Sequence, residues 1–175
     1  MKNKFRFSLS LSLFVIILLF NGCKYSMSGA STIAKTIQVE DFFNNTDLGP
    51  ANLGQTFTNR LKDYYQQNSS LSVVRESGEL VLEGMVTTYQ ITQLAPVSSG
   101  NSQTGDLAAL TRLTIGVRVN YTDTLEPKNS FKDRGFNFYA DFPNTQDLSS
   151  VQENLERKIM EQIFIDLFNA TIANW

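Results

Sequence analysis

The segment from Leu110 to Leu125, LTRLTIGVRVNYTDTL, determines the fold. Apolar side chains occupy every second position from 113 to 121, and the positions between them are polar, charged or glycine. The apolar set is Leu113, Ile115, Val117, Val119 and Tyr121. Because successive side chains of a strand point to opposite faces, this alternation predicts a strand with one buried and one solvated face. Such a strand is typical of a sheet that helices cover on a single side.

Four further segments on either side of this one are predicted to be strands, namely 32–40, 71–76, 80–94 and 131–142. In segment 80–94 the apolar phase changes near Gly84. The apolar residues before Gly84 share one parity, and the residues after it share the other: Met85, Tyr89 and Ile91. A β-bulge at Gly84 would reconcile the two phases.

Two amphipathic helices are predicted, over residues 51–67 and 148–173. Leu53, Phe57 and Leu61 repeat at helical spacing in the first, and two adjacent apolar stripes give the second a face wide enough to cover a sheet. The sequence therefore predicts an α+β fold, in which two helices pack on one face of a mostly antiparallel sheet of four to five strands.

The first 22 residues have the features of a signal peptide. Lys2, Lys4 and Arg6 make a positive start, and the uncharged run 7–20 is too short to span a bilayer, which needs about 20 apolar residues. Gly22 then precedes Cys23 as in a lipobox, so residues 1–22 are predicted to be a lipoprotein signal peptide, 23–31 a lipidated linker and 32–175 one domain. The alternative is a short transmembrane anchor.

The lone cysteine and the charge balance restrict the partners. Cys23 is the only cysteine, so it has no disulfide partner in the chain, and we expect it to carry acyl chains that hold the protein to a membrane. Three of the 15 basic residues lie in the leader, which contains none of the 17 acidic residues. The chain that remains after cleavage would therefore have 12 basic and 17 acidic residues, a net charge of −5. That balance argues against nucleic-acid binding, which needs a basic surface.

Little in the sequence supports catalysis. There is no histidine, and acylation would consume the one thiol, so no cofactor or metal site and no nucleophile is predicted. Paired carboxylates are the remaining option, namely Glu79 with Glu83 and Asp141 with Asp147. Solvated surface carboxylates are much commoner than catalytic pairs, so we predict that the protein is not an enzyme.

With this layout, the chain resembles the lipopolysaccharide-assembly lipoproteins, the LptE family. The resemblance lies in an acylated start, a first strand, a hairpin and the C-terminal helix, and it covers nearly the whole mature chain. The segments that carry it are 22–29 (GCKYSMSG), 37–45 (IQVEDFFNN), 80–84 (LVLEG), 112–117 (RLTIGV), 138–142 (FYADF) and 166–175 (DLFNATIANW).

The resemblance implies a two-helix, four-stranded fold and an outer-membrane lipoprotein that faces the periplasm. Such a protein plugs the lumen of a large β-barrel, the lipopolysaccharide translocon LptD, and assists lipopolysaccharide insertion in the outer leaflet. Lys24 follows Cys23 where an aspartate would favour inner-membrane retention, which agrees with that location. The alternative function is a generic periplasmic, lipid-anchored scaffold or binding module that is unrelated to lipopolysaccharide.

Two further contacts are hypothesised. Arg112 and Arg118 share the polar face of one strand, about 20 Å apart at strand rise, and arginine matches phosphate well, so they are candidates for lipopolysaccharide binding. The alternative is that they only keep the sheet soluble. Segment 96–105 consists mostly of small polar residues, which suit the polar wall of a barrel lumen. Its candidates for partner contact are Pro96, Ser98, Asn101, Gln103 and Thr104. The alternative, equally open, is that the segment is a loop without a partner.

Overall fold

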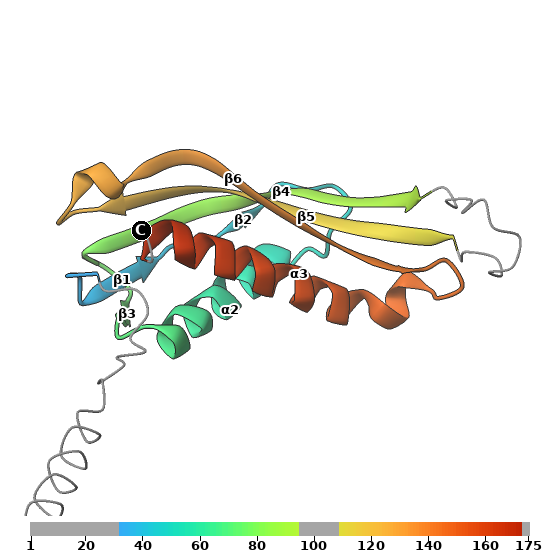
Figure 1. The fold of residues 1–175 in the computed structure, drawn as a ribbon, viewed down its shortest axis with the longest axis horizontal. Helices are drawn as coiled ribbons and strands as arrows, with labels where there is room; N and C mark the ends of the chain where they lie inside the picture. The colour runs from blue at the N-terminus through green and yellow to red at the C-terminus, as the bar shows by residue number, and fades with distance from the viewer. Residues whose placement is uncertain (1–31, 95–108, 173–175) are drawn as a thin grey trace, which may run out of the picture.

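Three long strands and two helices make up most of the fold (Figure 1). The computed structural model describes residues 32–94 and 109–172. The predicted signal peptide, Cys23 with the predicted linker, and the candidate contact segment 96–105 lie outside the described residues. In chain order the elements are β1 (Thr36–Val39), β2 (Phe43–Asn44), α2 (Leu53–Asn68), β3 (Ser72–Val74), β4 (Leu80–Leu94), β5 (Leu110–Asp123), the 3-10 turn η1 (Pro127–Asn129), β6 (Phe131–Pro143) and α3 (Leu148–Thr171).

The strands form one sheet in the order β3-β1-β4-β5-β6, with β2 beside β4. The two long pairings, β4 with β5 and β5 with β6, are antiparallel, whereas the short strands β1, β2 and β3 pair in parallel. The predicted α+β class with a mostly antiparallel sheet is thus confirmed. The sheet has six strands where four to five were expected, because β2 has only two residues and is too short to produce an alternation pattern.

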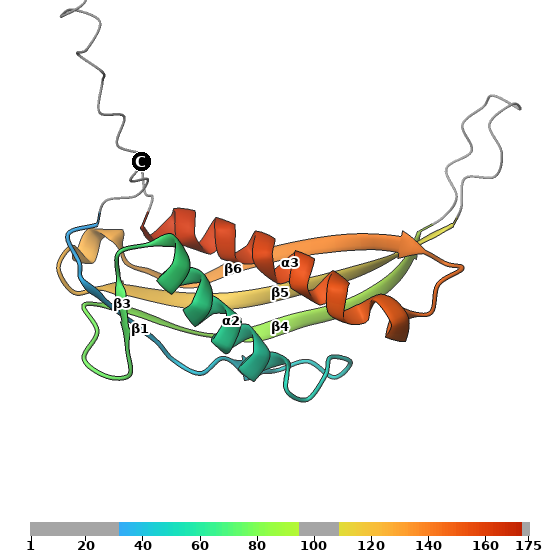
Figure 2. The same cartoon turned by 90° about the horizontal axis from the view of Figure 1, so that it is seen from below.

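Both helices lie on the same face of the sheet, which we call the inner face (Figure 2). The apolar set of β5 points to that face as predicted, and each of its five side chains is at most 1% exposed. In α3 the side chains of Leu155, Ile159 and Ile163 are buried in the same core, as are Phe57 and Leu61 of α2. The alternation in β5 and the helical stripes therefore identified the core correctly.

The predicted bulge lies at a different residue. Pairing of β4 with β5 is continuous at Gly84, opposite Val119, and the register shifts between Val86 and Thr88 instead. Gly84 is needed for space rather than for a bulge, because a Cβ atom there would lie 2.4 Å from the Arg118 carbonyl oxygen. As a consequence the Val86 side chain is buried. Met85 was expected to point into the core on the same side as Tyr89, but its side chain is 41% exposed.

The first helix connects two neighbouring parallel strands, so that β1, α2 and β3 form a β-α-β unit. The beginning of α2 lies against the chain that leads into β2. A Cβ atom on Gly54 would lie 2.2 Å from the Phe42 carbonyl oxygen, and the Thr58 hydroxyl accepts a hydrogen bond from the Phe42 amide at 2.8 Å. This close approach positions α2 across the ends of β1 and β3, where a pocket forms.

Candidate functional site

Arg112 lies on the outer face of the sheet, away from the helices, as predicted. Its Nε and one terminal nitrogen donate to the two carboxylate oxygens of Asp141 in β6, at 2.7 and 2.9 Å. Its guanidinium carbon also lies 3.6 Å from the ring centroid of Tyr139. The hydrogen bond from Arg112 lowers the pKa of the Asp141 carboxyl below its ordinary value. The fork of Arg112 is therefore engaged by a carboxylate of the same chain.

Arg118 lies on the same face but is less constrained. One terminal nitrogen is 2.5 Å from a carboxylate oxygen of Asp133, and the arginine side chain is 54% exposed, against 31% for Arg112. Asp133 has a left-handed backbone, with φ of 51°, and its amide donates to the Asn120 side chain at 2.8 Å. Because a single contact leaves most of its donors available, Arg118 is the better placed of the two arginines to bind an external anion.

The rest of the outer face is mostly polar. The facing residues of β4 and β5 include Thr88, Gln90, Thr92 and Thr114, and Asn137 of β6 covers Gly116. Apolar exposure occurs where β2 pairs with β4, since Phe43 is 74% and Met85 41% exposed, and at Tyr139 of β6, which is 47% exposed beside Arg112. An incoming surface would thus meet hydroxyls, amides and paired charges, with one apolar pair near the edge and one aromatic ring.

The candidate partner-contact residues Pro96, Ser98, Asn101, Gln103 and Thr104 lie outside the described residues, as does Cys23. The strands that flank the segment are described to their ends, where Leu94 pairs with Leu110. The segment therefore connects the last residue pair of the long β4–β5 hairpin.

Three of the four carboxylates considered for acid–base chemistry accept hydrogen bonds that organise the fold, whereas the Asp147 side chain makes no hydrogen bond that caps α3. The Glu79 side chain accepts from the backbone amides of Lys35 and Thr36 at the start of β1. Glu83 accepts from the Asn120 amide at 2.9 Å. Asp141 is held by Arg112, as described above. These contacts favour structural roles for all three carboxylates.

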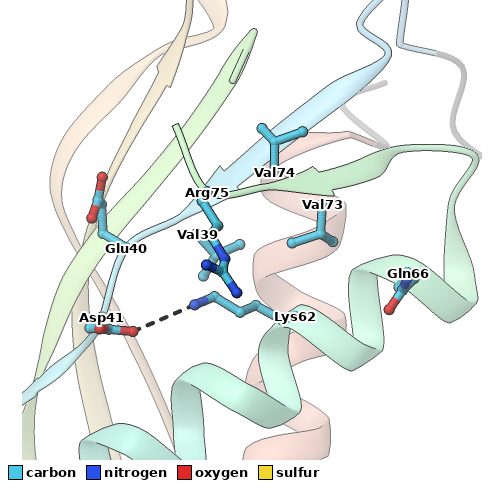
Figure 3. Close-up of a pocket in the computed structure, with 8 residues that line it drawn as sticks. All are labelled: Val39, Glu40, Asp41, Lys62, Gln66, Val73, Val74 and Arg75. Carbon is cyan, nitrogen blue, oxygen red and sulfur yellow. Dashed lines mark hydrogen bonds and ion pairs between the residues drawn. The ribbon is translucent and has the colours of Figure 1, made fainter. Parts of the chain in front are cut away.

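A pocket of about 530 Å3 opens between α2 and the ends of β1 and β3 (Figure 3). Its lining comprises Val39, Glu40, Asp41, Lys62, Gln66, Val73, Val74 and Arg75. The Lys62 ammonium lies 3.5 Å from an Asp41 carboxylate oxygen. Within the described part of the chain Arg75 makes no ion pair, and Figure 3 shows its guanidinium directed toward the Lys62 side chain. Two cations and the Asp41 carboxylate thus lie at one pocket, whereas the Glu40 carboxylate points away from them in Figure 3 and accepts a hydrogen bond from the Gln38 side chain.

The sequence reasoning did not identify this pocket. Lys62 belongs to the polar face of a helix, and Arg75 follows a strand of three residues, so each alone looks like an ordinary surface charge. Only the β-α-β pairing brings them together. The available signal was that charged residues directly follow two short strands on either side of the first helix, Glu40 and Asp41 after β1 and Arg75 after β3.

Two features are absent from residues 32–94 and 109–172. No group of three or more carboxylate, histidine or cysteine side chains there could hold a metal ion. Nor does that part of the chain contain a helix with the length and apolar character to cross a membrane.

Comparison with known proteins yields one family. The family model described as LptE, lipopolysaccharide-assembly, matches residues 34–171. A search of the curated proteins finds no match.

Several solved structures are similar in fold. A hypothetical protein from Chlamydia trachomatis has a TM-score of 0.54 at 11% identity, covering 81% of this chain and 99% of that one. An uncharacterized lipoprotein B from Nitrosomonas europaea has a TM-score of 0.52 at 12% identity, covering 82% and 84%. A protein from Xanthomonas campestris also scores 0.52 at 12% identity, covering 82% and 86%. At these identities the likeness shows the fold alone.

Proposed function

The chain belongs to the LptE lipopolysaccharide-assembly family, and from this premise we propose that it is an outer-membrane lipoprotein on the periplasmic side. In this proposal acyl chains on Cys23 anchor it, and the domain occupies the lumen of an LptD-like β-barrel and assists lipopolysaccharide insertion in the outer leaflet. The observation that carries the proposal is the family match, which spans 34–171 and so includes every described strand and helix. We propose no catalytic role.

The length of the tether is consistent with a position inside a membrane barrel. Eleven peptide units separate Cys23 from Ala34, where the family match begins, and a fully extended chain spans at most about 3.6 Å per residue. The domain would therefore stay within about 40 Å of the lipid surface. The polar outer face of β4–β6 suits the polar wall of a barrel lumen.

Co-purification tests the proposal. The full, acylated chain with a C-terminal affinity tag is extracted from outer membranes in mild detergent, and co-purifying proteins and lipopolysaccharide are identified. We expect a large outer-membrane β-barrel in near-equal amount. In the matched Cys23→Ala variant we expect an unprocessed precursor or loss from the outer membrane. Recovery of the wild-type chain without any barrel would refute the assignment.

Arg118, and less so Arg112, is proposed to contact lipopolysaccharide phosphates. Because Asp133 competes for the Arg118 guanidinium, Asp133→Asn is expected to strengthen binding of purified lipopolysaccharide, and Arg118→Gln to weaken it. Arg112→Gln serves as the comparison, with a smaller loss because Asp141 already occupies that fork. If none of the three changes alters binding, the arginines only solubilise the sheet.

The segment 96–105 is proposed to contact the barrel wall. Replacing Ser98–Thr104 with a two-residue turn removes no residue of the described core, so thermal unfolding should be unchanged. Recovery of the barrel should fall. Full recovery of the barrel with the shortened protein would assign the contact to another surface.

A further inference from the structure

We propose that the second half of β4, residues 88–94, pairs with the same segment of a second copy of this chain. The two strands would run antiparallel about a two-fold axis at Ile91, so that the sheets of the two copies join into one. The inference goes beyond the proposed function and uses only the lipid anchor from it.

The second half of β4 has a partner strand on one side only. Residues 88–94 pair there with residues 116–110 of β5. On the other side β1 pairs with residues 80–82 and β2 with residues 85–86, and no strand within 32–94 and 109–172 continues beyond them. Alternate residues of 88–94 therefore direct backbone N–H and C=O groups to an open edge, where another strand can bind.

The other two edges of the sheet are protected against such pairing. β3 has only three residues. β6 carries the exposed residues Lys132, Asp133 and Arg134, and its backbone is left-handed at Asp133, with φ of 51°. Short strands, edge charges and local kinks each discourage the addition of a strand. Segment 88–94 pairs regularly with β5 and contains neither a charged residue nor a proline, so it is the edge that remains available.

The side chain of Ile91 indicates where the axis lies. Ile91 pairs with the fully buried Leu113 and so lies on the inner face, yet it is 41% exposed. Figures 1 and 2 show that α2 does not reach this end of β4. An axis at Ile91 places the two isoleucines directly opposite each other and buries their exposed surface. The same axis sets Tyr89 opposite Gln93, and no charged residues meet.

A second copy suits this edge better than a strand of another protein. Segment 88–94 has no charge with which to select a different partner, whereas the antiparallel arrangement makes the segment its own complement. The contact is short, so it needs a high local concentration of its partner. Copies that are anchored to one membrane through Cys23 would provide that concentration.

Disulfide trapping tests the position of the axis. The full acylated chain is purified in a neutral detergent, where the Cys23 sulfur carries the lipid and an introduced cysteine is the only free thiol. Mild oxidation of Ile91→Cys should give a disulfide-linked dimer, because opposite residues of antiparallel strands have Cα atoms about 4.5–5.5 Å apart, within disulfide range. The matched control is Lys132→Cys, an exposed position on the β6 edge, which should stay monomeric.

Lysine substitution tests the same edge without a cross-link. Analytical ultracentrifugation in density-matched detergent measures the protein mass, and we expect the wild type to shift from monomer to dimer as its concentration rises. In Ile91→Lys two like charges would face each other at the axis, so the dissociation constant should rise at least about tenfold. The matched control is Ile165→Lys, the same change at a side chain of α3 that is 39% exposed, which should leave the dimer intact. Gln93→Lys, at an exposed polar position of the β4 edge, should also weaken pairing and keeps the test valid if Ile91→Lys does not fold.

Three results would overturn the inference: a wild type that is monomeric at every concentration, a dimer that persists in both lysine variants of β4, or equal trapping at positions 91 and 132. A monomeric wild type from which Ile91→Lys removes another co-purifying protein would overturn it as well, because the edge would then bind that protein. Barrel recovery with the wild type reports on the proposed function separately, because that assignment requires no contact between copies.

Discussion

Replacement of Ile115 by alanine tests whether the inner face of the sheet is the core of this protein. Ile115 lies in the middle of β5 and has no exposed surface. It pairs with Tyr89 of β4 on one side and with Phe138 of β6 on the other. Its side chain belongs to the same buried cluster as Ile159 of α3. The substitution leaves the backbone pairing intact and removes only packing.

The expected loss follows from the groups that are removed. Alanine lacks three carbon groups of isoleucine, and at about 0.8 kcal/mol for each buried group the transfer contribution is about 2.4 kcal/mol. A cavity adds to this loss, because strands hydrogen-bonded on both sides of β5 prevent the backbone from closing the space. We therefore expect the free energy of unfolding to fall by about 3–4 kcal/mol, within the range measured for such core truncations.

Urea denaturation of the full chain, followed by circular dichroism, measures this loss as a lower midpoint at an unchanged slope. The matched control is Ile33→Ala, the same chemical change at a side chain that is 68% exposed, which should alter stability by less than about 0.5 kcal/mol. A loss below about 1 kcal/mol for Ile115→Ala would mean that the assigned inner face does not form the core. Equal effects of the two substitutions would lead to the same conclusion.

Three further substitutions test other contacts. Gly54→Ala should lower the free energy of unfolding by about 1–3 kcal/mol, although alanine favours helices, because the added Cβ would lie 2.2 Å from the Phe42 carbonyl oxygen; thermal denaturation measures this. Asp141→Asn should destabilise the protein at neutral pH. The difference from wild type should shrink as the pH falls below 3.8 and through the Asp141 pKa, which Arg112 holds under that ordinary value, because a carboxyl with a lowered pKa stabilises the fold only while it is ionised. Denaturation midpoints measured at a series of pH values from 7 downward would check this, and a constant difference would contradict it. Burial raises the pKa of Tyr65 above the ordinary 10, so the stability that its neutral form provides is present below pH 10 and is lost as the pH rises above it. Tyr65→Phe should therefore reduce the loss of stability at alkaline pH. At neutral pH the variant should be less stable by about 1 kcal/mol, because the hydrogen bond to Thr171 is lost. An equal loss of stability at alkaline pH in the variant and the wild type would exclude Tyr65 as the cause.

The sequence by itself determined which residues of β5, α2 and α3 face the core. Alternation in 110–125 and helical spacing in 53–65 and 155–167 each depend only on the geometry of one element, so they can be read without knowing its neighbours. The family resemblance was likewise carried by short segments, and the family model confirms it over residues 34–171. Placement of Arg112 and Arg118 on the outer face followed from the same alternation.

Tertiary structure alone decided the partners of those residues. The bulge lies at Thr87, whereas pairing is continuous at Gly84, where the missing side chain leaves space for the ring of Phe42. The pairing of Arg112 with Asp141 depends on the register of β5 against β6, which no single strand pattern contains. Lys62 and Arg75 converge on one pocket only because α2 returns the chain to a strand parallel to β1. Periodicity reports the face on which a side chain lies, whereas its neighbours depend on how separate elements pack.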